Sequence, residues 1–192
     1  MRTMKAKEAI IILLVIGVMA VVTGCARWPE GPEPEPGETE YQLEITVEVS
    51  GIIDSYNGIY YIVMDTDGNA ATGPGYDISF WDDKFYYIVL EDGFFYFAQK
   101  EEGSPELYLA NSSISGNKIQ VTIALSDFGM PNSVDINVIT TDSNNNTYDH
   151  LDGYFTINTV LGSTGEGVIS GSGTGGTDFD ITKVTAVITT LY

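Results

Sequence analysis

From Tyr41 onward, apolar and polar residues alternate along the chain with a period of two, and this pattern restricts the fold more than any other feature. Apolar residues stand at 43, 45, 47 and 49, and again at 119, 121, 123 and 125. A period of two places successive side chains on opposite faces of a β-strand, whereas a helix has a period of about 3.6. A last alternating run, over 181–188, changes register around Lys183. No stretch of ten residues after the N-terminal segment has helical periodicity, so the sequence predicts an all-β fold.

Three denser apolar runs interrupt this alternation, at Ile59–Met64, Phe85–Leu90 and Phe94–Ala98. They are rich in aromatic and β-branched residues, which favours strands that are buried or covered on both sides. Turn signals separate the runs, and Asp92-Gly93 between two aromatic runs predicts a tight hairpin. We expect an antiparallel β-sandwich of immunoglobulin or jelly-roll type with about eight or nine strands.

The N-terminus has the pattern of an export signal. Three basic residues, Arg2, Lys5 and Lys7, precede an apolar run over 9–22, and Cys25 follows this run after Thr23 and Gly24. The arrangement resembles the lipobox of bacterial lipoproteins, in which the cysteine is acylated and becomes the first residue of the mature protein. We therefore expect 1–24 to be a signal peptide. The alternative is an uncleaved N-terminal anchor, although the run is shorter than the roughly 20 residues that span a bilayer.

An acylated Cys25 would make the lipid bilayer a partner, with the domain outside the cytoplasm on the cell membrane or outer membrane. Acyl chains such as palmitate anchor a protein stably when two signals act together. Ala26 stands where an aspartate would resemble an inner-membrane retention signal. Residues 25–40 are rich in Pro and Glu, which predicts a disordered tether.

The remaining residues, 41–192, are expected to form one β-sandwich domain. Within it, residues 162–176 are a Gly/Ser/Thr-rich run that predicts a flexible loop or an open hairpin tip. The chain has 8 Lys+Arg and 27 Asp+Glu, and loss of 1–24 would leave 5 basic and 26 acidic residues, a net charge of −21. Such an acidic protein repels nucleic acid, which we exclude as a partner.

Several segments together resemble the exported β-sandwiches of the type 9 carbohydrate-binding-module and DOMON-like superfamily. They are Tyr60–Asn69, Thr72-Gly73, Ile123–Gly129, Leu151–Ile157 and Asp178–Ile181. The resemblance spans most of residues 42–190. It implies a sandwich in which aromatic rings form a platform for a sugar.

Trp81 is the only tryptophan of the domain and is the first candidate for such a platform. It stands beside Asp82 and Asp83, whose carboxylates could bond sugar hydroxyls, and Tyr76 is a further candidate. Aromatic faces suit the C–H faces of sugar rings. The alternative is that Trp81 packs over the sandwich edge or a loop. Other tyrosines could contribute, namely Tyr86, Tyr87 and Tyr96.

Asp65, Asp67 and Asn69 have the one-three-five spacing that begins many calcium loops. The segment is not an EF-hand, because positions six and twelve are alanine and tyrosine, but Asp77 could close a site from across the loop. A run over 142–146 has the same spacing. The alternative for both segments is an Asx-rich turn whose side chains bond their own backbone. Calcium is thus a candidate cofactor.

Catalysis has little support in the sequence. His150 is the only histidine and Cys25 is assigned to the lipid, so a catalytic triad has one candidate base. We therefore expect a non-enzymatic, lipid-anchored binding module for a neutral saccharide. The alternatives are an envelope protein that contacts other proteins without a small ligand and, more distantly, a haem-binding DOMON-like module using His150, Met64 or Met130.

Overall fold

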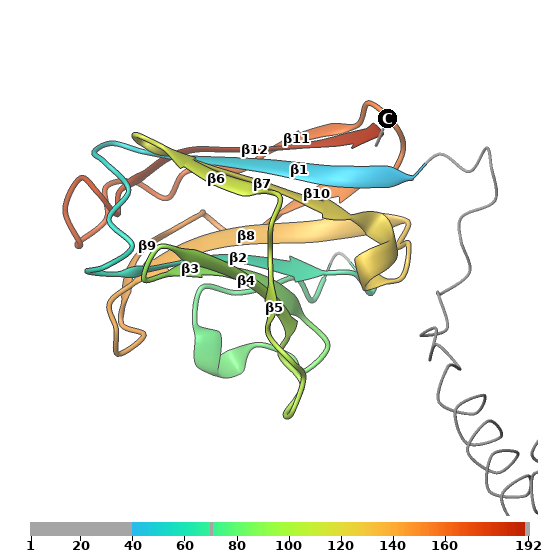
Figure 1. Ribbon diagram of the computed structural model, residues 1–192, viewed down its shortest axis with the longest axis horizontal. Coiled ribbons are helices and arrows are strands. Elements are labelled where there is room, and N and C mark those ends of the chain that lie inside the picture. The colour runs from blue at the N-terminus through green and yellow to red at the C-terminus, as the bar shows by residue number, and fades with distance from the viewer. Residues whose placement is uncertain (1–39, 70, 191–192) are drawn as a thin grey trace, which may run out of the picture. The chain divides into compact units, whose positions relative to one another are not determined.

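The computed structural model describes residues 40–69 and 71–190, and these residues belong to one compact unit. Two antiparallel sheets pack face to face (Figure 1), which confirms the predicted all-β sandwich. The described residues contain twelve strands rather than about eight or nine. The additional strands are short ones at the sheet edges. The expected signal peptide and nearly all of the tether lie outside the described residues.

The first sheet, called sheet A here, has five strands, and its central strand is β1. Their order is β11 (Thr164–Glu166), β12 (Ile181–Thr190), β1 (Tyr41–Val49), β7 (Lys118–Ala124) and β6 (Ser112–Ser115). Leu43, Ile45 and Val47 of β1 are fully buried, and the residues between them are not. Sheet A therefore buries one face, as the strict alternation predicted.

The second sheet, sheet B, has seven strands. Six of them follow the order β10 (Phe155–Asn158), β8 (Ser133–Thr141), β2 (Ile59–Asp65), β3 (Tyr86–Glu91), β4 (Phe94–Gln99) and β5 (Leu107–Tyr108). The seventh, β9 (Thr147–His150), also pairs with β8. Asp92 and Gly93 have positive φ angles of 49° and 81°, so the predicted tight hairpin joins β3 to β4. Two short 3-10 helices complete the fold, η1 (Ile78–Phe80) and η2 (Leu125–Phe128).

The main core lies between the sheets. Tyr60, Ile62 and Met64 of β2 face Ile45 and Val47 of β1 across this core, within one cluster of buried side chains. Each such side chain contributes about 1.5–3 kcal/mol by its removal from water. In β2 and β8 most residues on the opposite face are buried as well, while Tyr61 is half-buried. Along β2 and β8 sheet B is thus covered on both sides, which accounts for the dense apolar run at Ile59–Met64.

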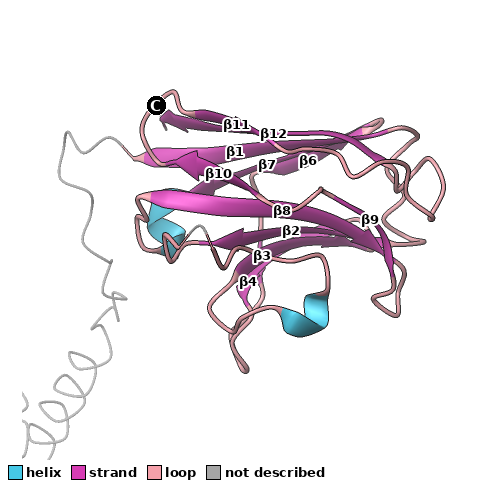
Figure 2. Ribbon diagram, turned by 180° about the vertical axis from the view of Figure 1, so that it is seen from behind, coloured by secondary structure: helices cyan, strands magenta, loops and turns pink. Residues whose placement is uncertain are grey.

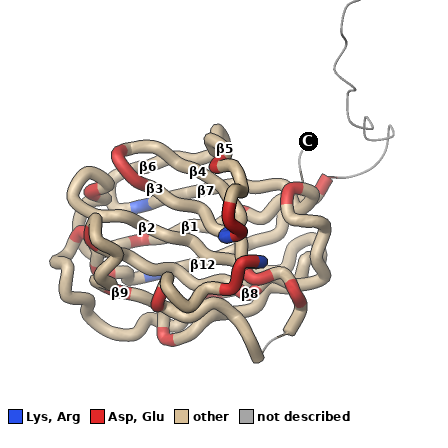
Figure 3. Tube along the Cα trace, turned by 90° about the horizontal axis from the view of Figure 1, so that it is seen from below, with Lys and Arg blue, Asp and Glu red and all other residues tan. Residues whose placement is uncertain are grey.

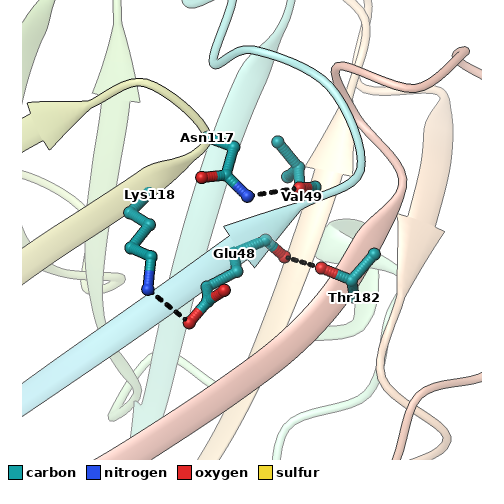
Figure 4. Close-up of polar contacts among 5 residues, drawn as sticks. All are labelled: Glu48, Val49, Asn117, Lys118 and Thr182. Carbon is teal, nitrogen blue, oxygen red and sulfur yellow. Dashed lines mark hydrogen bonds and ion pairs between the residues drawn. The ribbon is translucent and has the colours of Figure 1, made fainter.

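The expected change of register near Lys183 is present as a β-bulge. Glu48 pairs with Lys183 and Val49 pairs with Ile181, so Thr182 is an extra residue on β12. Figure 4 shows how polar contacts hold this end of sheet A: the Thr182 hydroxyl donates to the Glu48 carbonyl at 3.1 Å, and Lys118 Nζ lies 2.9 Å from Glu48 Oε1. A bulge bends the strand and increases its twist.

The prediction of a flexible loop over 162–176 is wrong for residues 164–166, which form β11 at the edge of sheet A. The glycines of this run allow close packing against neighbouring side chains. A Cβ at Gly165 would lie 2.8 Å from the Phe155 ring, and one at Gly175 would lie 2.4 Å from the Tyr148 ring. Only glycine can approach so closely, so the composition reflects contact with the sandwich.

Candidate functional site

The outer face of sheet B is covered by the connection from β2 to β3, residues 66–85. Figure 2 shows this connection with its short helix η1 below sheet B, on the side away from sheet A. Beneath it, four buried side chains form a second apolar cluster separate from the main core: Val63, Trp81, Phe85 and Ile139. The connection therefore gives sheet B a second hydrophobic layer.

Trp81 is the centre of this second cluster. Its side chain is only 6% exposed, and its Nε1 donates a hydrogen bond to the Gly75 carbonyl at 2.9 Å. The Tyr61 ring meets it edge-on, with 5.6 Å between ring centroids. Most of the Trp81 ring is therefore packed against its neighbours, in line with the alternative interpretation. A sugar could contact only the exposed margin of the ring.

Tyr61 and Tyr87 lie beside Trp81 and line a small pocket with it. The volume of the pocket is about 180 Å³. The Tyr87 ring is 6.2 Å from Trp81 and 6.4 Å from Tyr61 between centroids. Four polar residues line the same pocket: Glu91, Lys100, Glu106 and Asn145. The pocket thus combines an aromatic floor with a rim of donors and acceptors.

The two tyrosine hydroxyls of the pocket point to rim residues. Tyr61 donates to Asn145 Oδ1 at 3.1 Å, and Tyr87 donates to Glu106 Oε1 at 3.3 Å. Burial, with the nearby Glu91 and Glu106 charges, raises the pKa of Tyr61 to about 12, and burial and Glu106 raise the pKa of Tyr87. Both phenols therefore stay neutral and able to donate at physiological pH.

Asn145 reaches the pocket from the turn between β8 and β9. It adopts a left-handed conformation, with φ of 63°, which asparagine tolerates better than most residues. Asp142 Oδ1 accepts hydrogen bonds from the backbone N–H groups of Asn144 and Asn146, both at 2.8 Å. The Asn146 side-chain amide donates to Asp142 Oδ2 at 2.7 Å, and this bond, together with the backbone bonds, lowers the pKa of Asp142. The run over 142–146 is therefore a turn that orders itself and presents Asn145.

The other candidate sugar ligands lie away from this pocket. Tyr76 is exposed, and its ring stacks on His150 at 4.5 Å between centroids. Asp82 and Asp83 are exposed, and Asp82 Oδ1 accepts from the backbone N–H of Lys84. Of the predicted residues, Trp81 and the further candidate Tyr87 line the pocket. Tyr61 was missed by the sequence analysis, although the alternation within β2 places it on the face opposite Tyr60.

In the predicted calcium loop, the side chains bond their own backbone. Asp65 Oδ1 accepts from the N–H of Asp67 at 3.0 Å, Asp67 Oδ1 accepts from that of Asn69 at 2.6 Å, and Asp77 caps helix η1 through Ser79. These are the contacts of Asx turns. Among the residues that the structure describes, no three His, Cys, Asp or Glu side chains are grouped to hold a metal ion. Calcium at this loop stays a prediction.

The residues considered for haem ligation lie apart from one another. Met64 is fully buried in the core between the sheets, whereas His150 lies on β9 beneath Tyr76. The Nδ1 atom of His150 is 2.6 Å from the Leu151 carbonyl oxygen. Met130 is 56% exposed after helix η2. His150 is therefore a half-buried strand residue.

Comparisons of the chain with protein-family models, with curated proteins and with solved structures gave no match. Within the part of the chain that the structure describes, no helix is long and apolar enough to cross a membrane. Cys25 lies outside the described residues. The function is therefore inferred mainly from the geometry of sheet B and its outer face.

Proposed function

We propose that this protein is a lipid-anchored, extracytoplasmic and non-catalytic binding module whose ligand is a neutral saccharide. The observation that carries the proposal is the pocket formed by Tyr61, Trp81 and Tyr87 on the outer face of sheet B. Anchoring through Cys25 rests on the export signal and its lipobox-like ending. The resemblance to type 9 carbohydrate-binding modules agrees with both parts of the proposal.

The chemistry of the pocket suits a sugar ring. Half-exposed Tyr61 and Tyr87 offer apolar surface to C–H groups, and their neutral hydroxyls can exchange hydrogen bonds with sugar hydroxyls. Glu91 and Glu106 accept hydrogen bonds, and Lys100 donates them. A neutral ligand avoids repulsion by the many acidic residues whose positions Figure 3 marks in red along the chain. The pocket is smaller than the roughly 300–1,000 Å³ of enclosed small-molecule sites. We therefore expect it to hold one ring of a longer, solvent-exposed chain.

A second candidate function is contact with another envelope protein, without a small ligand. The burial of Trp81 supports this alternative, because the ring of this first candidate sugar platform is largely used in packing. Exposed apolar residues at the β4–β5 edge also support it, namely Phe94, Leu107 and Tyr108. A haem-binding role has less support, because Met64 and His150 lie on different faces of sheet B.

The proposal is tested by affinity electrophoresis of the full-length protein through gels that contain a panel of neutral polysaccharides. We expect retardation on at least one glycan. Tyr87→Ala should reduce affinity for that glycan about tenfold, because aromatic contacts contribute roughly 0.5–1.5 kcal/mol beyond burial. Tyr87→Phe should keep most of the affinity, because the ring remains.

The matched control is Tyr108→Ala, which removes an exposed tyrosine from the same sheet but outside the pocket. Its binding should equal that of the unmodified protein. Absence of retardation on every glycan would overturn the saccharide proposal and leave protein contact as the favoured function. Equal losses for Tyr87→Ala and Tyr108→Ala would reject this pocket as the site.

A further inference from the structure

Two aspartates lie directly opposite each other on the outer face of sheet B. Asp65 ends β2, Asp135 lies on β8, and the two are paired residues in the register of these antiparallel strands. Each is only 3% exposed. Paired residues on one face have Cβ atoms about 4.5–5.5 Å apart, and like charges in this arrangement destabilise a sheet. The pair therefore requires a compensating partner.

The hydrogen bonds of the two carboxylates leave one buried oxygen without a partner. Asp135 Oδ1 accepts from the Thr156 hydroxyl on β10, and Asp65 Oδ1 accepts from the backbone N–H of Asp67 at 3.0 Å. Asp65 Oδ2 is buried and accepts no hydrogen bond. Within residues 40–69 and 71–190, no lysine forms an ion pair with either carboxylate. Leaving a buried carboxylate oxygen without a partner is costly.

The surroundings of Asp65 disfavour its ionised form when no cation is bound. Burial raises the pKa of Asp65, and the charges of Asp67 and Asp135 raise it further. A bound cation would reverse this effect on Asp65. This agrees with the geometry but does not by itself identify the missing partner.

The covering connection closes over this end of the sheet. The Asn137 side chain, next on the same face of β8, donates from Nδ2 to the Pro74 carbonyl at 2.9 Å. Gly73 packs so closely on the Tyr154 ring that a Cβ there would lie 2.5 Å from it. Gly73 and Pro74 are thus fixed over the sheet, with Pro74 bonded to the residue two positions along β8 from Asp135. Their backbone carbonyls belong to the class of oxygen ligand that hard cations prefer.

We propose that Asp65 and Asp135 bind a hard divalent cation, with Ca²⁺ as the ion best suited to the site. The two carboxylates would supply the negative ligands, and backbone carbonyls of the covering connection and solvent would supply the remainder of the six to eight oxygens that Ca²⁺ takes. This site differs from the loop predicted from the sequence, with which it shares only Asp65. It is also independent of saccharide binding.

The test measures thermal unfolding and calorimetric Ca²⁺ binding with the full-length protein after treatment with EDTA. Saturating Ca²⁺ should raise the unfolding midpoint by about 5 °C or more, because a ligand that binds only the folded state stabilises it. Asp65→Asn and Asp135→Asn should each weaken Ca²⁺ binding at least tenfold. Either variant should also unfold at a higher temperature than the unmodified protein in EDTA, because a buried charge is removed.

The matched control is Asp67→Asn, which removes an exposed carboxylate of the same connection. It should bind Ca²⁺ within about threefold of the unmodified protein, since water screens an exposed charge strongly. The proposal is overturned if Ca²⁺ neither binds nor shifts the midpoint, in which case a proton shared by the two carboxyls compensates the pair. It is also overturned if Asp67→Asn loses as much affinity as Asp65→Asn, which would assign the ion to the loop.

Discussion

The two sheets of the sandwich use their outer faces in different ways. On sheet A the outer face is polar, with Glu44 and Thr46 on β1 beside Gln120 on β7 and Thr185 on β12. On sheet B the equivalent face is buried over much of β2 and β8, beneath residues 66–85. Antiparallel sheets commonly keep one face in water, and sheet A follows that rule. Sheet B departs from it.

The covered outer face of sheet B carries features that a sandwich does not need for folding. The aromatic pocket and the Asp65–Asp135 pair both lie on the covered face of sheet B, at opposite ends of β2. Residues that depart from the local rules of stability tend to mark function. Both proposed sites therefore lie on the outer face of sheet B, whereas the outer face of sheet A is a solvated surface.

The largest expected effect comes from removing the centre of the second hydrophobic layer. Trp81→Ala should lower the free energy of unfolding by about 3–5 kcal/mol, because a buried aromatic side chain is lost and a cavity remains. Urea denaturation followed by circular dichroism measures the change.

The control for that experiment is the adjacent Phe80→Ala. Phe80 is 84% exposed, so its loss should change the free energy of unfolding by no more than about 0.5 kcal/mol. Similar effects for both variants would mean that the connection does not pack on sheet B, and the contrast between the two outer faces would be wrong.

A smaller effect is expected from the polar contact that fixes the cover to the sheet. Asn137 is 1% exposed, and its side chain is bonded to the carbonyl of the buried Pro74. Asn137→Ala should cost about 1–3 kcal/mol in the free energy of unfolding, since a buried carbonyl loses its donor.

The matched variant on sheet A is Gln120→Ala, which removes an exposed side-chain hydrogen bond to Glu44. Because solvent replaces that bond, the change should stay within about 0.5 kcal/mol. Chemical denaturation of both variants side by side measures the difference. A cost for Gln120→Ala equal to that for Asn137→Ala would show that the two faces do not differ in this way.

Much of this architecture could be predicted from the sequence, because burial on one face imposes a period of two. The alternation of β1 gave its burial correctly, and the change of register at Lys183 corresponds to the bulge. The short strand β11 escaped prediction because its central residue, Gly165, has no side chain to reveal a pattern. It forms through pairing with β12 and contact with Phe155, neither of which is local in sequence.

The candidate site was less predictable, since it depends on contacts between distant segments. The aromatic character of Trp81 was evident, but its burial depends on Tyr61 and Val63 of β2, which no local pattern relates to it. Asp65 was recognised through its spacing from Asp67, whereas its partner Asp135 lies 70 residues further along the chain. Only the pairing of β2 with β8 brings these two carboxylates together.

The smallest expected effect tests how little the polar outer face of sheet A contributes. Lys118 and Glu48 form an ion pair there (Figure 4), and the Lys118 side chain is half exposed. Lys118→Met keeps the apolar stem and removes the charge, and it should change the free energy of unfolding by less than about 1 kcal/mol. The change should shrink further in 1 M salt, where the screening length falls to about 3 Å. A larger cost that persists in salt would mean that the ion pair fixes the bulge at Thr182, and that the outer face of sheet A also carries structural constraints of its own.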